Sequence, residues 1–203
     1  LEEAPDRIVS LTPSNTEILF ELGLDEEVVG VNDNDNYPEQ VADKTRIGGI
    51  EYNIETIISL QPDVVFAHES SMFTFESAIE QLEASGVTVF VVDNAETFDE
   101  TYETIEVIGT LTGKDEEADK IIASIQSKLA DIQAKLQGVS PKTAFMVVGA
   151  SPDIYVVGQN TFMNEMLKEI NVDNAVKEEG WPLYSAEQFI TANPDSIVFT
   201  YAG

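Results

Sequence analysis

The sequence predicts an α/β fold made of two Rossmann-like lobes with mostly parallel sheets, joined by one long α-helix. Segments patterned as strands alternate with segments patterned as helices, at the spacing of parallel βα units. One long amphipathic stretch, residues 115–137, divides the chain. A segment that precedes this stretch partly reappears after it. These three observations together predict two similar lobes with a helix between them.

The long stretch is predicted to be a helix because its apolar residues share one face. They recur at steps of four, four, three and four residues: Ile121, Ile125, Leu129, Ile132 and Leu136. Residues 115–117 are acidic, and Lys128 and Lys135 lie towards the other end, which suits the helix dipole. A helix of this length would measure roughly 34 Å. So narrow a stripe also suits a coiled coil, but the repeated segments on either side favour a connection between lobes.

The repeated segment occupies residues 55–66, ETIISLQPDVVF, and residues 187–199, EQFITANPDSIVF, once a gap of one residue is allowed. Each copy is predicted to form a short helix, a Pro-Asp break and a buried strand. An internal duplication of this kind predicts two equivalent lobes. A cleft between lobes is a common place for a small ligand to bind.

The first lobe is predicted to contain four strands bounded by turn residues: residues 7–11, 28–31, 63–67 and 87–92. Helices are predicted after Ser14, after Asn53, over residues 74–85 and over residues 97–111. Ser14 with Glu17, and Thr97 with Glu100, have the spacing of capping boxes. Residues 32–38, NDNDNYP, are predicted to form a polar loop.

The second lobe is predicted to contain strands at residues 143–148 and 154–157, a helix at residues 161–169, and the second repeat copy. The first lobe continues for about 45 residues after its copy, from Phe66 to Leu111, whereas the second lobe stops at Gly203. We therefore expect an N-terminal lobe of residues 1–112, a connecting helix of residues 113–138, and a truncated C-terminal lobe of residues 139–203.

The composition excludes several classes of protein. The chain has 203 residues, of which 43% are hydrophobic, enough for one large domain or two small ones. It has no cysteine, which excludes disulfides and thiolate metal sites. Its 10 basic and 38 acidic residues give a net charge of -28, so nucleic acid is not an expected partner. Because the acidic residues are spread along the chain, we interpret them as a solvated surface suited to high salt.

The chain also lacks the usual catalytic constellations. It has a single histidine, so neither a Ser-His-acid triad nor a site with several histidine ligands is expected. No pair of carboxylates stands out. We therefore expect no catalytic residue, no resident metal and no cofactor.

Five segments together resemble the substrate-binding proteins of ABC importers for metal chelates, which bind ferric siderophores or vitamin B12. They are RIVSLTPSNTEILFELGL, the loop at Tyr37-Pro38, NIETIISLQPDVVFAHES, the long helix, and GWPLYSAEQFITANPDSIVF. The resemblance covers nearly all of the chain in the same order. It implies two lobes joined by a single long helix, and a chain that continues further in other members.

The resemblance also implies a function. A member of this family captures a metal chelate between its lobes and delivers it to the transmembrane subunits of an ABC permease. It works as a monomer in the periplasm, or outside the cell as a lipoprotein anchored through an N-terminal cysteine. The absence of that cysteine here would mean a recombinant or cleaved domain, attached to the membrane only through a lost lipid anchor or the permease.

Two glutamates match the residues with which family members dock onto permease arginines, one in each lobe: Glu55 and Glu187. A purely structural reading is also open. Each lies in the first turn of a predicted short helix, where a carboxylate contributes roughly 0.3–1 kcal/mol through the helix dipole. The identical placement in both repeat copies favours the docking role.

The resemblance places several residues in the ligand cleft. Trp181 matches an aromatic residue that lines the cleft of cobalamin-binding members, although a single Trp more often lies in a core. Asn34 and Gly49 stand where those members have aromatic residues. The remaining candidates follow predicted strands or lie in loops, where a purely structural role is also open: Pro13, Ser14, Tyr37, His68 and Tyr155.

The few basic residues limit the charge of the ligand. Family members that bind anionic catecholates use Arg or Lys in the cleft, and Lys44 and Arg46 are the nearest that this chain offers. A neutral or weakly charged chelate, a corrinoid or a ferric hydroxamate, fits better. Two other functions stay open: a two-lobed chelatase or cofactor enzyme, whose iron–sulfur clusters would need cysteines, and an acidic protein-interaction module.

Overall fold

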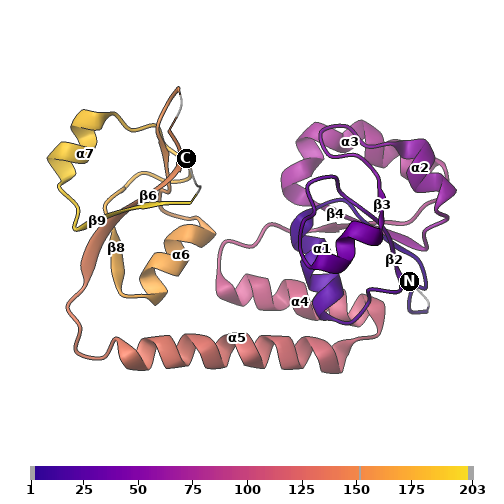
Figure 1. Cartoon of the computed structure of the whole chain (residues 1–203), viewed down its shortest axis with the longest axis horizontal. Helices are drawn as coiled ribbons and strands as arrows, with labels where there is room; N and C mark the ends of the chain where they lie inside the picture. Colours follow the sequence, from indigo (N-terminus) through magenta and orange to yellow (C-terminus); the bar gives the residue numbers. More distant parts are fainter. Residues whose placement is uncertain (1–2, 151, 201–203) are drawn as a thin grey trace. The chain divides into compact units, whose positions relative to one another are not determined.

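The computed structural model describes residues 3–150 and 152–200, except for the side chains of residues 71–75. Its strands are mostly parallel and are flanked by helices, so the predicted α/β fold class is confirmed (Figure 1). Contacts between residues divide the chain into two units. Unit 1 comprises residues 1–94 and 102–122, and unit 2 comprises residues 95–101 and 123–203. The division falls inside the long helix, and the lobe boundaries expected from the sequence stay predictions.

Unit 1 is built on five parallel strands in the order β3-β2-β1-β4-β5. The strands are β1 (Ile8–Ser10), β2 (Val28–Val31), β3 (Thr45–Arg46), β4 (Val64–His68) and β5 (Val89–Val92). The helices that accompany them are α1 (Pro13–Glu21), the 3-10 helix η1 (Glu39–Asp43), α2 (Ile54–Ser59), α3 (Glu69–Ala84) and α4 (Phe98–Thr112). The first turn of α4 belongs to unit 2, where Phe98 contacts Phe162 with 5.1 Å between ring centroids.

The sheet of unit 1 is covered on both faces, which explains why its strands are continuous apolar runs. On one face, β1 and β4 pack against α2 and α3, with a core of Val9, Leu11, Ile57, Val65, Ala67, Ile79 and Leu82. On the other face, α1 contacts β1, β2 and β4 (Figure 1). Side chains alternate along a strand, so the fully buried Phe66 points away from Val65 and Ala67.

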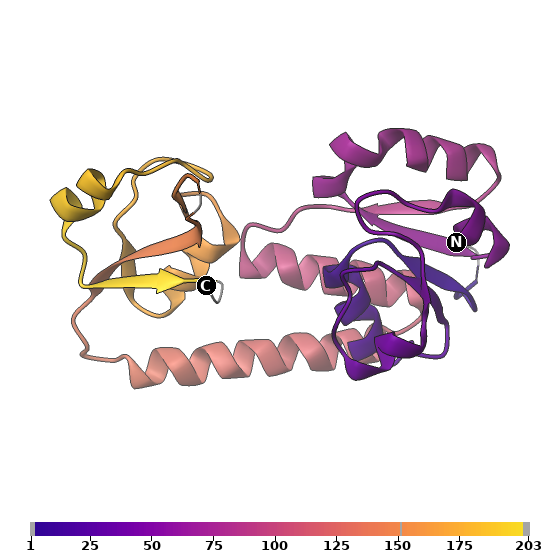
Figure 2. The ribbon, with the colours of Figure 1, turned by 45° about the horizontal axis from the view of Figure 1, so that its top comes forward.

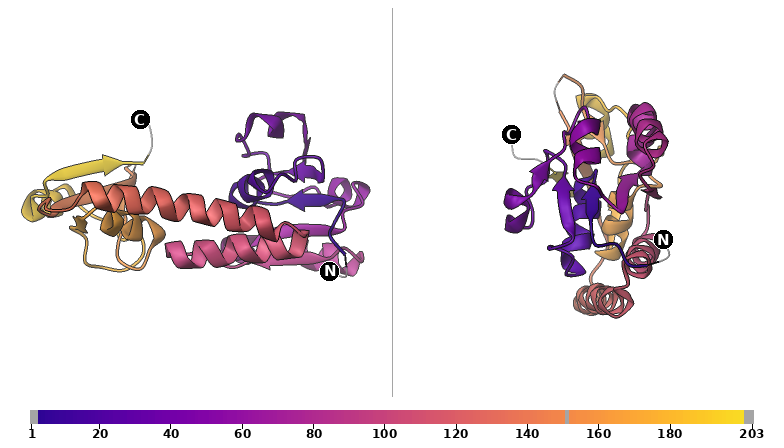
Figure 3. Two further views of the ribbon diagram at one scale, coloured as in Figure 1. Left: turned by 90° about the horizontal axis from the view of Figure 1, so that it is seen from below. Right: turned by 90° about the vertical axis from the view of Figure 1, so that its right-hand side faces the viewer.

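The long helix α5 (Asp115–Lys135) begins in unit 1 and continues into unit 2. Its first turns lie beside the end of α4 (Figure 3). Gly109 permits this approach, because a Cβ there would lie only 2.7 Å from the Cβ of Ala118. Within the part of the chain that the structure describes, no helix is both long and apolar enough to cross a membrane.

Unit 2 holds a smaller sheet around β6 (Lys142–Gly149). β8 (Val172–Asn174) and β9 (Ser196–Phe199) pair with β6 in parallel, and β7 (Tyr155–Val156) pairs with it in antiparallel orientation. Two helices precede β8 and β9, namely α6 (Phe162–Glu169) and α7 (Ala186–Ala192). In the core, the ring of Phe145 lies 4.4 Å from that of Phe189 and 5.4 Å from that of Tyr184, between centroids.

The two repeat copies fold alike. The first forms α2 and β4, and β4 pairs in parallel with β1; the second forms α7 and β9, and β9 pairs in parallel with β6 (Figure 2). The Asp after each Pro makes the same contact. Asp63 accepts a hydrogen bond from the N–H of Arg7 at 2.9 Å, and Asp195 accepts one from the N–H of Thr143 at 2.8 Å. The predicted burial of the strand is confirmed for the first copy and wrong for the second: β4 is almost entirely buried, whereas every residue of β9 is exposed.

Two predicted helix starts are wrong. The predicted capping box of Ser14 and Glu17 does not form, because Pro13 occupies the first helical position and Thr12 is the N-cap. α3 begins at Glu69 rather than near residue 74, because His68 caps it directly after β4. By contrast, Glu100 N–H donates to Thr97 Oγ1 at 3.1 Å and Thr97 N–H donates to Glu100 Oε2 at 3.0 Å, so that predicted capping box is confirmed.

The excess of acidic residues predicts a melting temperature that depends on salt. With 10 basic and 38 acidic residues, one-to-one pairing would leave 28 carboxylates without a cation. Their mutual repulsion opposes the folded state. The screening length falls from ~30 Å in 0.01 M salt to ~3 Å in 1 M salt, so we expect the Tm to rise across that range in calorimetry. A flat or falling curve would show that local pairing or specific cation binding removes the repulsion.

Candidate functional site

The carboxyl ends of the five strands of unit 1 lie at one edge of the sheet, because all five run parallel. Each predicted ligand residue of this unit follows one of these strands or ends it. Pro13 and Ser14 follow β1, Asn34 and Tyr37 follow β2, Gly49 follows β3, and His68 ends β4. Glu69 Oε2 accepts the N–H of Asn94 at 3.0 Å, which links the chain after β4 to the chain after β5.

The loop of residues 32–38 presents some side chains outward and holds others inward. Asn34 and Tyr37 are exposed, Tyr37 by 62%, and a cis peptide bond joins Tyr37 to Pro38. Asn32 and Asp35 are each only 3% exposed. Burial raises the pKa of the Asp35 carboxyl above its usual range, although hydrogen bonds from Thr16 and Asn32 and the nearby Arg46 act in the opposite direction.

Asn34 and Gly49 lie next to each other. A Cβ at Gly49 would lie 3.2 Å from Asn34 Nδ2 and 3.3 Å from Asn32 Oδ1. The two chain segments are also joined through Asp33, whose N–H donates to the carbonyl oxygen of Gly48 at 3.0 Å. A larger residue at position 49 would therefore press on the loop, which makes glycine the residue that fits here.

The two basic residues expected near the ligand are both engaged by backbone carbonyls. Arg46 Nη1 donates to the carbonyl oxygens of Asn32, at 2.7 Å, and Asp35, at 2.9 Å. Lys44 Nζ donates to the carbonyl oxygen of Asp25 and lies 5.8 Å from the centroid of the Phe20 ring. Both cations therefore stabilise the fold of unit 1.

His68 is half-buried, and its Nδ1 accepts the N–H of Ser70 at 3.2 Å as the N-cap of α3. Because Nδ1 is an acceptor, the proton of the neutral ring lies on Nε2. Burial lowers the pKa of His68, while Glu69 and Asp93 act to raise it. The neutral ring can thus offer an N–H donor at the carboxyl end of β4.

In unit 2, Trp181 and Tyr155 lie on two paired segments. Residues 178–184 run along residues 154–159 through backbone bonds that include Val156 N–H to Pro182 O at 3.1 Å and Gly158 N–H to Gly180 O at 2.7 Å. Tyr155 bridges to Leu183. The side chains of Tyr155, Trp181 and Leu183 are 43%, 51% and 54% exposed. The pairing of these segments was not predicted, and it leaves three large apolar side chains at the surface.

The Trp181 segment is closed by a side-chain bond between its two ends. Tyr184 Oη donates to Glu178 Oε2 at 2.7 Å. Burial and this carboxylate together raise the pKa of Tyr184 to about 12, and the hydrogen bond lowers the pKa of Glu178. The phenol therefore stays protonated at any physiological pH and keeps Trp181 in a short closed loop.

Both units carry a buried Asn at the carboxyl end of their second parallel strand. Asn32 Oδ1 accepts the N–H of Asn34, and Asn174 Oδ1 accepts the N–H of Val176, each at 2.9 Å. Their amides donate to the carbonyl oxygens of Leu11, at 2.7 Å, and Val157, at 2.9 Å. Sequence reasoning missed this pair: Asn32 directly follows the apolar strand β2, but β8 reads Val-Asp-Asn and gives no comparable apolar signal for Asn174.

Glu55 and Glu187 occupy equivalent positions. Each is exposed in the first turn of its helix, behind an N-cap whose side chain accepts a backbone N–H: Asn53 for α2 and Ser185 for α7. Both helices lead to the amino end of a strand that pairs with the first strand of its sheet. The predicted docking residues are thus placed alike in the two units.

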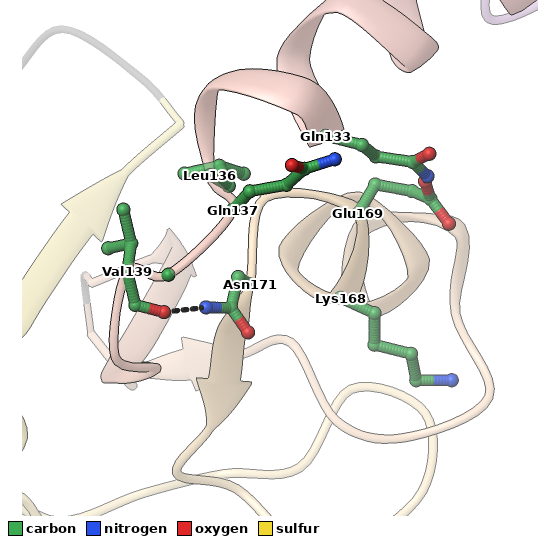
Figure 4. Close-up of a pocket in the computed structure, with 8 residues that line it drawn as sticks. Gln133, Leu136, Gln137, Val139, Lys168, Glu169 and Asn171 are labelled. Atoms are coloured by element: carbon green, nitrogen blue, oxygen red, sulfur yellow. Dashed lines mark hydrogen bonds between the residues drawn. The ribbon is translucent and has the colours of Figure 1, made fainter.

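Two cavities lie away from most of these residues. One of about 390 Å³ is lined by Gln133, Leu136, Gln137, Gly138, Val139, Lys168, Glu169 and Asn171 (Figure 4). It lies where α5 and α6 end, beside the amino ends of β6 and β8, and none of the predicted ligand residues lines it. The other, of about 310 Å³, includes Tyr37 and is otherwise lined by residues of α1 and the turn after it, and by η1 and its N-cap: Glu17, Phe20, Glu21, Asp25, Pro38 and Gln40.

Comparison with known proteins identifies relatives along almost the whole chain. A family model described as periplasmic binding protein matches residues 8–202. A Bacillus subtilis protein named as an uncharacterized ABC transporter substrate-binding lipoprotein is 45% identical over 204 residues, which cover 98% of this chain and 65% of that protein. This chain thus spans less than two thirds of that relative's length.

Two further relatives are named or described by what they bind. A vitamin B12-binding protein of Photorhabdus laumondii is 28% identical over 203 residues, covering 98% of this chain and 72% of that protein. A crystal structure from Staphylococcus epidermidis, described as a possible iron-binding periplasmic solute-binding protein, is 35% identical with a TM-score of 0.90. The match covers 99% of this chain and 79% of that one.

The cap at His68 predicts a pH-dependent stability. Since the folded-state pKa lies below the unfolded value of about 6.5, folding favours the neutral ring. Its stabilisation is complete above pH 6.5 and is lost as the pH falls below that value. In His68→Asn the cap acceptor is kept but does not titrate. We expect the wild type to lose more Tm than this variant between pH 8 and pH 5. If the Tm of the wild type differs from that of His68→Asn by the same amount at pH 8 and at pH 5, this account is contradicted.

Proposed function

Because this chain belongs to the periplasmic binding protein family, we propose that it captures a metal chelate and delivers it to an ABC importer. One observation carries the proposal: exposed amide and hydroxyl groups and a half-buried imidazole lie at the carboxyl ends of the strands of unit 1, while an exposed aromatic surface forms in unit 2. Large, mostly neutral chelates present an apolar ring or shell with peripheral amide groups. Aromatic surfaces and a few polar groups are what such ligands need.

The residues that we propose to contact the chelate come from both units. Unit 1 supplies Pro13, Ser14, Asn34, Tyr37, Gly49 and His68, and unit 2 supplies Tyr155 and Trp181. The relatives support a chelate as ligand, since one is named for binding vitamin B12 and another is described as possibly binding iron. We propose that each set contributes contacts to the chelate.

The charge of the site supports a ligand without net negative charge. Lys44 and Arg46 already donate to backbone carbonyls, and carboxylates such as Glu69 and Asp93 flank His68. An anionic catecholate would meet repulsion at this edge. A corrinoid and a ferric hydroxamate both lack a net negative charge, and we propose these two classes as the ligand.

We propose that Glu55 and Glu187 dock onto cationic residues of the permease. The placement of one exposed carboxylate at the same position of each unit supports this role, as does the name of the Bacillus subtilis relative. The full-length protein would act as a monomer outside the cytoplasmic membrane, held there by a lipid anchor. An enzyme on the same scaffold is the less favoured alternative, because this chain offers neither cysteines nor a catalytic constellation.

Trp181 gives a direct test of ligand capture, since it is the only tryptophan of this sequence. We expect cyanocobalamin or a ferric trihydroxamate to quench its fluorescence saturably, because Trp181 is half exposed on the proposed binding surface. Free N-acetyltryptophanamide corrects for light that the chelate absorbs. A ferric tricatecholate should bind at least about tenfold more weakly, because Lys44 and Arg46 already donate to backbone carbonyls. No saturable quenching by either neutral chelate would contradict the proposal.

Reversing the charge of both docking residues should separate delivery from capture. In cells that carry the full-length protein and its permease, we expect Glu55→Lys with Glu187→Lys to reduce chelate uptake about tenfold or more. Chelate affinity should stay within about twofold, since neither residue belongs to the proposed ligand set. The matched control is Glu83→Lys, an exposed reversal near the end of α3. Normal uptake by the double variant would refute the docking role.

A further inference from the structure

We propose that Asp35 and Arg46 are positioning residues, which fix the loop of residues 32–38 in the conformation that binds the chelate. The inference rests on the proposed function, because it concerns the same binding face. It assigns a role to a buried carboxylate and to an arginine that do not themselves belong to the proposed ligand contacts.

The loop needs such support because regular strand pairing ends before it. β2 ends at Val31, and the chain next enters a regular element at Glu39. Between these points Asn34 and Tyr37 are exposed, whereas Asn32 and Asp35 are each 3% exposed. A loop without side-chain bonds would populate many conformations, and ordering it on ligand binding would reduce affinity. The buried side chains of Asn32 and Asp35 can therefore fix the loop conformation in which Asn34 and Tyr37 are exposed.

Asp35 ties the loop to the rigid part of unit 1. Its Oδ2 accepts the hydroxyl proton of Thr16 at 2.7 Å and the N–H of Asn32 at 3.1 Å. Thr16 is fully buried on α1, and its hydroxyl lies 2.7 Å from that of Ser10 at the end of β1. One carboxylate oxygen thus joins the loop to a helix and to the central strand.

Arg46 holds the same turn from the other side. Its Nη1 donates to the carbonyl oxygens of Asn32 at 2.7 Å and Asp35 at 2.9 Å. Those two residues are also the ends of the turn that the Asp35 N–H closes onto the Asn32 carbonyl oxygen at 3.1 Å. The flat, fixed donor geometry of a guanidinium suits two neighbouring carbonyls, which a lysine would bridge poorly.

Stability alone does not account for a carboxylate at this position. Among the described residues, Asp35 Oδ1 has no hydrogen-bond partner although it is buried. A buried carboxylate with an unpaired oxygen is unfavourable for folding. If Asp35 shapes the binding loop at some expense of stability, its replacement should weaken chelate binding without an equivalent loss of thermal stability.

The test measures chelate affinity and thermal stability for matched variants. Wild type is first titrated with cyanocobalamin and with a ferric trihydroxamate, and the one that binds is used throughout. We expect Asp35→Ala and Arg46→Lys each to raise its Kd about tenfold or more. Asp35→Asn keeps an oxygen that can accept the hydrogen bonds from Thr16 and Asn32, so it should keep most of the wild-type affinity. Arg7→Ala is the control, because Arg7 Nε donates to the carbonyl oxygen of Leu60 at 2.7 Å before β1, at the opposite edge.

The control should lower the Tm while leaving the Kd within about twofold of wild type. Hydrogen–deuterium exchange of residues 32–38 should accelerate in Asp35→Ala and Arg46→Lys and stay unchanged in Arg7→Ala. Unchanged affinity in Asp35→Ala and Arg46→Lys overturns the inference while leaving the proposed function in place. Weaker binding without faster loop exchange also overturns it. If wild type binds neither chelate, the proposed function fails, and this inference fails with it.

Discussion

All five strands of unit 1 run in the same direction, and this constraint places the candidate ligand residues. Parallel strands send their carboxyl ends, and the loops that follow, to one edge of the sheet. Ser14 and His68 are therefore brought to the same edge although 54 positions separate them in sequence. In unit 2, β6, β8 and β9 follow the same rule. A ligand face of this kind needs no dedicated binding domain, since the sheet topology supplies it.

Polar side chains tie these loops to the rest of each unit. In unit 1 the support comes from Asn32, Asp35 and Arg46, and in unit 2 from Asn174 and the bond between Tyr184 and Glu178. The bonds made by Asn32, Asp35 and Asn174 satisfy groups that would otherwise be buried without a partner, whereas the bond between Tyr184 and Glu178 is exposed. Rigid loops lose less conformational entropy on binding, so the same contacts yield more affinity.

The regular elements could be predicted from sequence because their signals are local. The steps of the long helix, the apolar run Val64–Ala67 and the Asn53 cap all depend on neighbouring residues. The Pro-Asp repeat also predicted correctly that two segments adopt the same fold. The start of α1 was misplaced by a local competition: Pro13 is favourable at the first helical position, so Thr12 becomes the N-cap instead of Ser14.

The interior of the loops could not be predicted, because it depends on long-range contacts. Asp33 and Asp35 are chemically identical, yet only Asp35 turns inward, towards Thr16. Sequence reasoning placed Arg46 among the basic residues nearest to the ligand, but it did not reveal that Arg46 holds two loop carbonyls, which follows from β3 running beside β2. The pairing of residues 178–184 with residues 154–159 has no periodic signal at all. Roles for the individual site residues therefore stay proposals.

The central claim is that a chelate binds at the carboxyl ends of the parallel strands. The most direct measurement is a crystal structure of the full-length protein with its bound chelate, in which anomalous scattering locates the cobalt or iron atom. The account predicts a metal position beside the loop of residues 32–38, at the carboxyl ends of the strands of unit 1. A metal instead seated in the cavity between Gln133 and Asn171, or at the amino ends of the strands, would contradict it.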